Sequence, residues 1–284
     1  MRIRTYSDLH LDSQFNHTGL YDPDSETHGL WVPPSLPHDK ETILCLAGDL
    51  WVGTKWIEYL GFSWISAVAS KFKQVLVVNG NHDLWSTAHG LTIVDAARKC
   101  NDMLVAHDIH NVTVLDCDTV EIDDVLFVGA TLWTDMHKGD PLTMYNMKTY
   151  MKSDGNIKYR TGPSGQYERF TSAKWIQTHA THAEYIRQVA SANPNKKVVI
   201  ITHHQPVTFV GDPLYEGHPS NGYYSSDLSD IMLANENIAM WNCGHSHHTV
   251  NERFNKTLLY CNPVGYQFES RERMQKVLHH YIDV

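Results

Sequence analysis

Acids, amides and imidazoles recur at the ends of predicted strands along this sequence. They stand in five short segments, which read Asp8-Leu9-His10, Gly48-Asp49, Gly80-Asn81-His82-Asp83, His203-His204 and Gly244-His245-Ser246-His247. Each segment alone is compatible with ordinary turn chemistry, because Gly, Asn and Asp are common in turns. The ordered set is more informative, because the carboxyl ends of strands in an open α/β sheet converge on one crevice. We therefore expect these side chains to meet in space.

The residue types in this set predict a site for two divalent transition metal ions. Mixed carboxylate and imidazole ligands suit Mn, Fe, Zn, Co or Ni, whereas ligands that are all oxygen suit Ca or Mg. Asp49 offers a carboxylate that can bridge two ions. Residues two apart on an extended segment share one face, so we expect Asp8 and His10 to form a pair, and likewise His245 and His247. Among the candidate metals we favour Mn.

The elements that must position these residues alternate between strands and helices. Apolar runs such as Thr42–Gly48 and Gln74–Gly80 are typical of strands that are buried on both faces. The other expected strands are Ile3–Ser7, Asn111–Leu115, Val120–Ile122, Val125–Leu132, Lys197–Thr202, Ala239–Cys243, Thr257–Cys261 and Val277–Tyr281. Apolar residues at helical spacing predict the helices Thr54–Lys73, His89–Asn101 and Ser172–Ala192. This order of elements predicts an α/β fold.

Two stretches fit the alternation poorly. Tyr21–Lys40 holds four of the eleven prolines, which predicts an irregular surface excursion. The region at about 134–170 is rich in Gly, Met, Tyr and Lys, and we interpret it as an insertion. Neither stretch is long enough for an independent domain, so we expect residues 1–284 to form one domain.

The role of the insertion stays open between two interpretations. Its basic residues alternate with tyrosines, an arrangement that binds nucleotides by charge and stacking. A solvated loop with a few packed tyrosines explains the same composition. Trp85 and the segment Asn221–Tyr224 are open in a similar way, between the lining of a pocket and packing in the core.

Composition excludes several classes of protein. The chain has 284 residues, of which 42% are hydrophobic and 19% charged, as in a soluble globular protein. Its net charge of −9 argues against a long nucleic acid as partner. It lacks both an apolar run long enough to span a membrane and a signal peptide, so we expect no membrane partner. Five Cys without CxxC spacing indicate reduced thiols and a cytoplasmic location.

The ordered motifs D-x-H, G-D, G-N-H-D, H and G-H-x-H resemble those of the calcineurin-like metallophosphoesterase superfamily. Four further segments resemble a group of small bacterial and phage members, namely residues 7–11, 131–135, 202–206 and 262–266. The resemblance implies a four-layer α/β/β/α sandwich of two mixed sheets, with a di-metal centre at one edge. A phage-encoded member would act in the host cytoplasm.

The resemblance also implies a division of labour among the motif residues. One metal ion takes Asp8, His10, Asp49 and His247, and the other takes Asp49, Asn81, His203 and His245. His203 is preferred to His204 as the ligand, because the corresponding family residue comes first after the strand. The family places a catalytic His at position 82, and an imidazole is a suitable general acid near neutral pH. What orients His82 is open, and Asp83 is the nearest candidate.

The expected function is hydrolysis of a small phosphate ester by a metal-bridging hydroxide, with His82 as general acid. Protein Ser/Thr phosphatases continue their second motif as G-D-x-V-D-R-G, whereas this chain continues without that Asp and Arg. This difference argues against protein phosphatase activity and favours a phosphodiester or nucleotide substrate. The alternatives are a nuclease of the same superfamily, a phosphomonoesterase and a non-catalytic metal-binding scaffold. The oligomeric state is left open.

Overall fold

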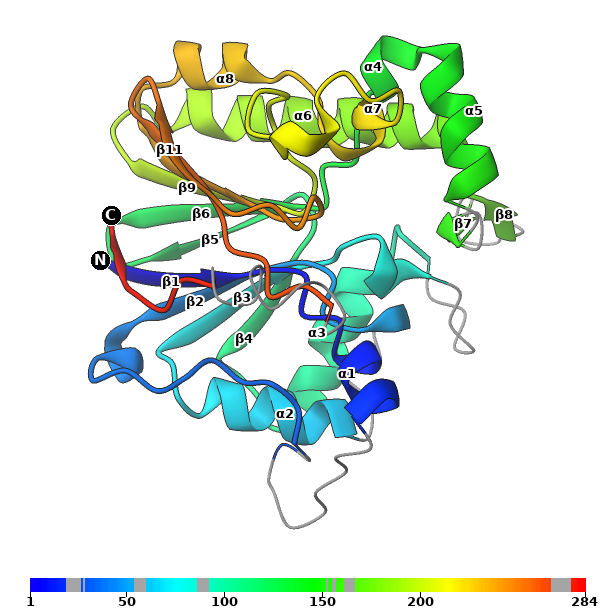
Figure 1. The fold of residues 1–284 in the computed structure, drawn as a ribbon. Helices are drawn as coiled ribbons and strands as arrows, with labels where there is room; N and C mark the ends of the chain where they lie inside the picture. Colours follow the sequence, from blue (N-terminus) through cyan, green and yellow to red (C-terminus); the bar gives the residue numbers. More distant parts are fainter. Residues whose placement is uncertain are drawn as a thin grey trace.

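A computed structural model of the chain describes residues 1–18, 27, 29–53, 60–85, 92–151, 153–154, 157–160, 167–266 and 277–284. Two β-sheets lie face to face between two layers of helices (Figure 1). This arrangement confirms the expected α/β/β/α sandwich of two mixed sheets. Among the described residues, no helix is long and apolar enough to cross a membrane.

The first sheet has the strand order β13-β1-β2-β3-β4. Its strands are β1 (Arg2–Tyr6), β2 (Ile43–Ala47), β3 (Gln74–Val78), β4 (Val112–Leu115) and β13 (Ile282–Asp283). The first four strands are parallel, and β13 pairs antiparallel with β1 at the edge. The helices on its outer face are α1 (Leu11–Thr18), α2 (Leu60–Ala69) and α3 (Ala96–Ala106), as Figure 1 shows.

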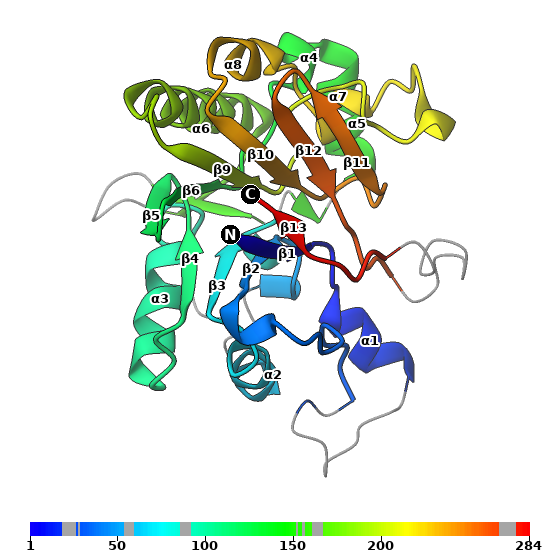
Figure 2. The same cartoon turned by 90° about the vertical axis from the view of Figure 1, so that its left-hand side faces the viewer.

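The second sheet has the strand order β11-β12-β10-β9-β6-β5. Its strands are β5 (Asp118–Ile122), β6 (Val125–Ala130), β9 (Lys197–Thr202), β10 (Ile238–Cys243), β11 (Val250–Phe254) and β12 (Thr257–Cys261). The four inner strands are parallel, and the two edge strands are antiparallel. Helices α6 (Ser172–Ala192) and α8 (Ser229–Ala234) cover its outer face (Figures 1 and 2).

The remaining elements lie beside one end of the sandwich. They are α4 (Met136–Gly139), α5 (Pro141–Tyr150), the hairpin of β7 (Lys158–Arg160) and β8 (Tyr167–Arg169), and α7 (Asn221–Tyr224). Short 3₁₀ turns span Asp39–Glu41, His82–Leu84 and Pro213–Tyr215.

The apolar strands bury both faces, as their sequences predict. In β2, Leu44 and Leu46 pack toward the helices, whereas Ile43 and Cys45 pack between the two sheets. In β9, Val198 likewise packs toward the helices, whereas Val199 packs between the two sheets. Because both faces of each sheet are covered, the strands are rigid supports for the loops at their carboxyl ends.

Several predicted boundaries were wrong. The last strand is not Val277–Tyr281 but the two-residue β13, and α3 begins at Ala96 and ends at Ala106, later than His89–Asn101. Residues 54–59 and 89–91 of the predicted helices, and 21–26 and 28 of the excursion, lie outside the described residues. The strand β11 was missed because its polar side chains face solvent at the sheet edge. The insertion contains helices rather than only a loop.

Helix α6 places two buried histidines one turn apart against the loop that follows β6. The His179 Nδ1 lies 3.1 Å from the Leu132 carbonyl oxygen, and the Leu132 N–H donates to His182 Nδ1 at 3.2 Å. Leu132 and Trp133 have φ angles of 73° and 57°, which are costly for large side chains. The two histidines therefore pair the backbone of a strained loop.

We predict that His182 makes the protein less stable in acid. Burial lowers the pKa of His182 from 6.5 to about 4. The unfolded chain therefore binds a proton more readily than the folded chain, and this contribution to stability is complete above pH 6.5 and is lost as the pH falls toward 4. Between pH 8 and pH 5 the loss is about 2 kcal/mol.

Urea unfolding of His182→Gln in chelator tests this expectation. The Gln amide oxygen can still accept from Leu132, so the variant should show a shallower decline in unfolding free energy than the wild type. The exposed His110 supplies the control, and His110→Gln should decline like the wild type. An unchanged slope in His182→Gln would contradict the role of this ring.

Candidate metal centre

The loops after β1, β2, β3, β9 and β10 converge at one end of the sandwich and bring the seven predicted ligands together. Three groups of side chains have ligand atoms within 4.8 Å of one another: Asp8, His10 and His247; His10, Asp49 and His82; and Asp49, His203 and His245. Asn81 joins the third group, because its Oδ1 lies 3.0 Å from His203 Nε2. The site thus consists of two adjoining clusters, one with Asp8, His10 and His247 and one with Asp49, Asn81, His203 and His245. Asp49 also lies near the first cluster, because it groups with His10.

The sequence predicted that these side chains converge because strand residues alternate between faces. The structure brings them together in a different way. Strand β1 ends at Tyr6, and Asp8 and His10 have φ angles of 53° and 43°. His245 and His247 have φ angles of 71° and 53°, and they fall in different clusters. A left-handed backbone is uncommon outside Gly, although Asp and His adopt it more readily than most residues. Such strain is typical of functional sites.

Glycines make room for the ligands. A Cβ on Gly80 would lie 2.0 Å from Asp49 Oδ1 and 2.5 Å from the Asp49 backbone nitrogen. A Cβ on Gly48, whose φ is 86°, would lie 2.5 Å from His203 Nδ1. The Gly-Asp and Gly-Asn-His-Asp motifs therefore need Gly for space around the ligands, in addition to its conformational freedom.

Asp83 holds the backbone of the Asp49 loop, whereas the sequence suggested it as the residue that orients His82. One carboxylate oxygen accepts from the N–H groups of Asp49 and Gly80, each at 2.8 Å. The other accepts from Leu50 and Trp51, each at 3.0 Å. With both oxygens engaged by two N–H groups each, the carboxylate is not aimed at the ring of His82.

Ring stacking orients His82 instead. Its ring lies on the ring of Trp85, with centroids 3.6 Å apart and planes 28° apart. Its Nε2 lies 3.9 Å from Asp49 Oδ2 and 3.5 Å from the Tyr266 hydroxyl, and the backbone N–H of His82 donates to Asp49 Oδ1 at 2.9 Å. The side chain is 16% exposed, so it lies at the border between the cluster and solvent.

The hydrogen bonds of His203 reveal the chemical character of the cluster. Its Nδ1 lies 2.8 Å from the Ala47 carbonyl oxygen, so the ring donates there, and Nε2 either carries a proton or offers its lone pair to a metal. Nε2 faces Asn81 Oδ1 at 3.0 Å, His245 Nδ1 at 3.2 Å and Asp49 Oδ2 at 3.4 Å. These acceptors repel one another unless positive charge lies among them, which a proton on His203 supplies in the metal-free chain and a metal ion would supply in its place. A metal-ligating His typically donates its other N–H to a carbonyl, as His203 does.

The cluster of Asp8, His10 and His247 shows the same pattern. The Nε2 atoms of His10 and His247 are 3.0 Å apart, and His247 Nε2 is 3.5 Å from Asp8 Oδ1. The Asp8 carboxylate accepts the backbone N–H of His245, which connects the first and last motifs. The donors are therefore two nitrogens and a carboxylate oxygen, a set that suits divalent transition metals.

The pKa values of Asp49 and His203 show that their cluster attracts positive charge. Burial opposes a charged ring, yet the carboxylates of Asp49 and Asp8 raise the pKa of His203 to about 9. Burial also opposes a charged Asp49, yet the rings of His203 and His82 hold its pKa well below the usual range. The rings of His10 and His245 have lowered pKa values because they are buried, so they stay neutral and keep lone pairs for a metal.

His204 lies behind the cluster rather than in it. Its Nδ1 is 3.2 Å from the Thr131 carbonyl oxygen, and its ring centroid is 4.3 Å from that of His245. Burial lowers its pKa well below the usual range, so the ring is neutral. The two adjacent histidines thus occupy different positions, with His203 in the cluster and His204 behind it.

Sequence reasoning missed the roles of two neighbours of the site, Tyr266 and Asp154, and left two others, Tyr223 and Trp85, open between pocket and core. The ring of Tyr266 stacks on His10 with centroids 3.9 Å apart, whereas the sequence linked its segment, 262–266, only to the family resemblance. Tyr223 and Trp85 contact His245 and His82, which favours the pocket interpretation of both. Asp154, buried in the insertion, carried no recognisable signal in the sequence.

A fourth group of ligand atoms, from Asp116, Cys117 and His182, lies away from the motif loops and does not fit a metal. His182 accepts the Leu132 N–H at Nδ1, so the proton of its neutral ring is on Nε2. That nitrogen is the one that faces Asp116 Oδ1, at 3.8 Å. A metal ligand needs the opposite arrangement, with the lone pair toward the group.

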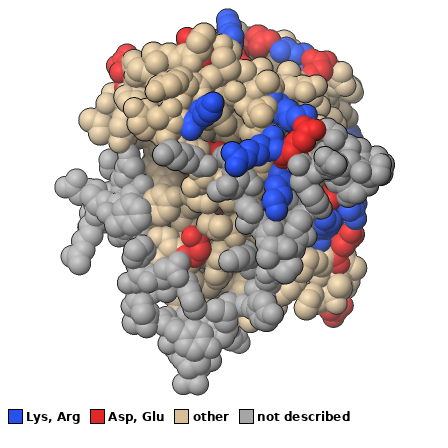
Figure 3. All heavy atoms as spheres, turned by 90° about the vertical axis from the view of Figure 1, so that its right-hand side faces the viewer, with Lys and Arg blue, Asp and Glu red and all other residues tan. Residues whose placement is uncertain are grey.

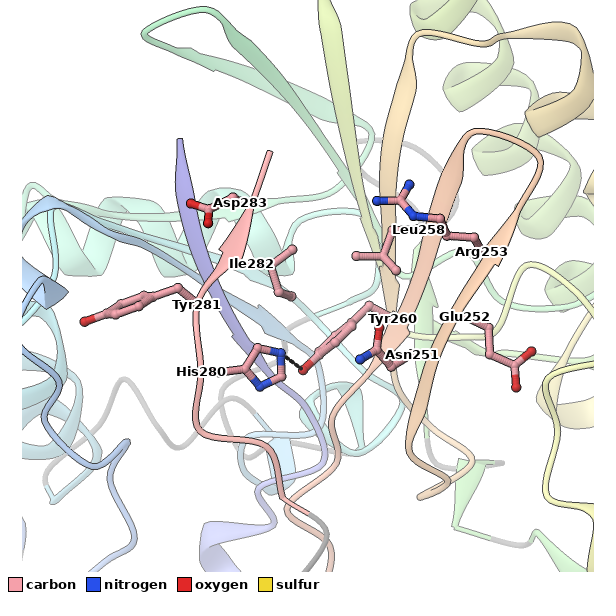
Figure 4. A pocket seen from close by; sticks show the side chains of 9 residues that line it. All are labelled: Asn251, Glu252, Arg253, Leu258, Tyr260, His280, Tyr281, Ile282 and Asp283. Carbon is pink, nitrogen blue, oxygen red and sulfur yellow. Dashed lines mark hydrogen bonds between the residues drawn. The ribbon is translucent and has the colours of Figure 1, made fainter.

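A cavity of about 440 Å³ lies apart from these clusters, between β11, β12 and the C-terminal segment (Figure 4). Within it the Tyr260 hydroxyl and His280 Nε2 are 3.3 Å apart. It contains none of the seven predicted ligands, and its lining residues are Asn251, Glu252, Arg253, Leu258, Tyr260, His280, Tyr281, Ile282 and Asp283. We therefore place the chemistry at the motif loops.

Several known proteins are similar to this chain. A viral protein, the uncharacterized protein L509 of Acanthamoeba polyphaga mimivirus, is 26% identical over 302 residues, covering 100% of this chain and 97% of the relative. Among solved structures, the phosphopantetheinyl hydrolase of Mycobacterium tuberculosis is similar with a TM-score of 0.66 at 15% identity, over 97% of this chain and 93% of that one. A dimetal phosphatase from Danio rerio is 12% identical with a TM-score of 0.48, over 94% of this chain and 88% of that one.

The sequence itself matches a family description over most of its length. Residues 1–249 match the calcineurin-like phosphoesterase family, and this range includes all five motifs. Together with the clusters of His and Asp, the match indicates a binuclear site for divalent metals. The chain therefore belongs to the calcineurin-like phosphoesterase family.

Proposed function

We propose that this chain hydrolyses a small phosphate ester, preferably a phosphodiester or a nucleotide, with two divalent metal ions, of which Mn is favoured. Asp8, His10, Asp49 and His247 hold one ion, and Asp49, Asn81, His203 and His245 hold the other. The observation that carries the proposal is the convergence of ligand atoms from Asp49, Asn81 and His245 on His203 Nε2.

The residues of the chain supply the remaining steps. When bound, the two ions provide an activated water and positive charge for the phosphoryl oxygens. His82 donates a proton to the leaving oxygen, since its Nε2 is directed toward the cluster and an imidazole changes charge near neutral pH. Trp85 fixes the plane of that ring, and the Tyr266 hydroxyl lies near the same nitrogen.

Charge supports the preference for a diester. In the described part of the chain, the side chains that form hydrogen bonds, ion pairs or ring contacts with the cluster include no Lys or Arg. A monoester carries up to two negative charges, whereas a diester carries one and needs less compensation. Figure 3 looks onto this end of the molecule, where the described surface is mostly uncharged and Lys and Arg gather on one part of it.

A nucleotide is the favoured form of the substrate because of helix α5. It exposes Tyr145 and Tyr150, which are 61% and 71% accessible, with Lys148 on the same helix. Exposed rings beside a cation are suited to a base and a phosphate.

We predict that Gly80→Ala weakens metal binding. Its new Cβ displaces the Asp49 carboxylate and backbone, which both clusters share. Calorimetric titration of metal-stripped protein with Mn²⁺ should show a loss of affinity of about tenfold or more. Gly211→Ala is the matched control, because its Cβ meets only the Thr208 carbonyl oxygen at 3.6 Å. Equal affinities for the two variants would contradict a centre built on Asp49.

His82→Ala should lower kcat by about 10²- to 10⁴-fold while two metal ions still bind. The loss should be larger for a nucleoside diester than for bis-nitrophenyl phosphate, because nitrophenolate leaves readily without a proton. His110→Ala, at an exposed position, serves as the control. An equal loss on both esters would remove His82 from proton transfer, even if activity fell.

A screen of metals against substrates tests the reaction class. We expect turnover to disappear in chelator, to return with Mn²⁺, and to be faster with bis-nitrophenyl than with mononitrophenyl phosphate. Faster monoester hydrolysis with every metal would defeat the diester preference. Single- and double-stranded DNA and RNA belong in the same screen, and cleavage of either would favour the nuclease alternative.

A further inference from the structure

A buried carboxylate from the insertion reaches the metal centre. Asp154 lies between α5 and β7 and is 1% exposed. Its Oδ1 accepts from Asn81 Nδ2 at 3.1 Å and from Trp85 Nε1 at 2.7 Å, and its Oδ2 accepts from the Tyr223 hydroxyl. Its three partners come from the loop after β3 and from helix α7, so one side chain joins three segments.

These bonds determine which way the amide of Asn81 faces. An amide can present either its oxygen or its NH₂ group to a neighbour, and only the oxygen is a metal ligand. The NH₂ group of Asn81 donates to Asp154 and also lies 3.3 Å from the Tyr223 hydroxyl oxygen. With the NH₂ group engaged on that side, Oδ1 faces His203. A flipped amide would place a carbonyl oxygen against a carboxylate.

The same carboxylate also reaches the proposed acid. Trp85 donates its indole N–H to Asp154 and stacks its ring on His82. Asn81 and Trp85 flank the short turn His82–Leu84, so Asp154 holds both ends of the segment that carries His82.

The charge of Asp154 points to the same role. Its three hydrogen-bond donors are neutral groups, and burial of a carboxylate without a cation is costly. Asp39 is also buried, but its carboxylate pairs with the Arg4 guanidinium at 2.8 Å. A cationic centre next to Asp154 supplies the compensation that Arg4 gives to Asp39.

We infer that Asp154 is a positioning residue, which turns the Asn81 oxygen toward the metal centre and fixes the Trp85 ring that supports His82. The insertion therefore completes the centre, in addition to any part it plays in substrate choice. This inference rests on the proposed function for the identity of the metal ligands.

Metal titration of Asp154 variants tests the inference. We expect Asp154→Ala to weaken one of two Mn²⁺ binding steps by about 10- to 100-fold and to leave the other step unchanged, because Asn81 belongs to one cluster only. Asp154→Asn should recover most of the affinity, since its amide oxygen can accept from Asn81 and Trp85. Tyr223→Phe, which removes one partner of Asn81, should give an intermediate loss.

Asp39→Asn is the matched control. It weakens the buried pair of Asp39 and Arg4, which includes none of the predicted metal ligands. It should therefore lower Tm without changing either Mn²⁺ step. If Asp154→Ala does not fold, the Asp154→Asn and Tyr223→Phe variants decide the matter. Mn²⁺ affinities equal to those of the wild type in the folded variants would overturn the inference.

The outcomes separate this inference from the proposed function. A wild-type chain that binds two Mn²⁺ ions but hydrolyses no ester overturns the proposed function and leaves the role of Asp154 to be decided by the titration. Normal hydrolysis with unaltered metal steps in the Asp154 variants overturns the inference alone. A wild-type chain that binds no divalent metal overturns both.

Discussion

The mutual repulsion of acceptor atoms is the constraint that the structure must satisfy. Around His203 Nε2, a carboxylate oxygen, an amide oxygen and a second imidazole nitrogen all lie within 3.4 Å. Without positive charge, from a proton on His203 or from a metal ion, such an arrangement would spread apart, so the fold also has to restrain it. The two sheets do so, because their strands are buried on both faces and cannot shift without opening the core.

Backbone N–H groups provide the second part of this force. The Asp83 carboxylate accepts from four backbone N–H groups in two loops, and the Asp8 carboxylate accepts from the loop that follows β10. These bonds tie the motif loops to one another rather than to their own strands. The left-handed angles at Asp8, His10 and Asp49 are the local cost of aiming side chains inward from loops held in this way. The buried sheets thus stabilise the fold, and the strained loops at their carboxyl ends lower that stability.

The parts of the fold that the sequence predicts are those with a periodic or ordered signal. Ser172–Ala192, Lys197–Thr202 and Thr257–Cys261 match their predicted boundaries because apolar spacing continues to their ends. The convergence of the motif residues was predictable from their order along the chain. The geometry that brings Asp8 and His10 together was not, because left-handed backbone leaves no periodic trace.

The residues around the site were harder to predict for a different reason. Asp83 looked like the partner of His82 because it is its neighbour, but a short turn directs its carboxylate to backbone amides. Asp154 is far from the motifs in sequence and has a polar, loop-like context, so only the packing of the insertion against α7 shows its position. Long-range contacts of single polar residues have no signature in one sequence.

Asp154 also bears on the choice between ester classes, through the charge of the complete centre. Two divalent ions would bring four positive charges, and the carboxylates of Asp8, Asp49 and Asp154, when ionised, together with the proposed hydroxide remove four. A centre without net charge accommodates a phosphodiester, which carries one negative charge, better than a monoester dianion. Each further buried carboxylate reduces the attraction for a dianion about twice as much as for a monoanion, because the Coulomb energy is proportional to the charge of the ligand. The charge of Asp154 therefore supports the proposed diester preference independently of any contact between the surface of the insertion and the substrate.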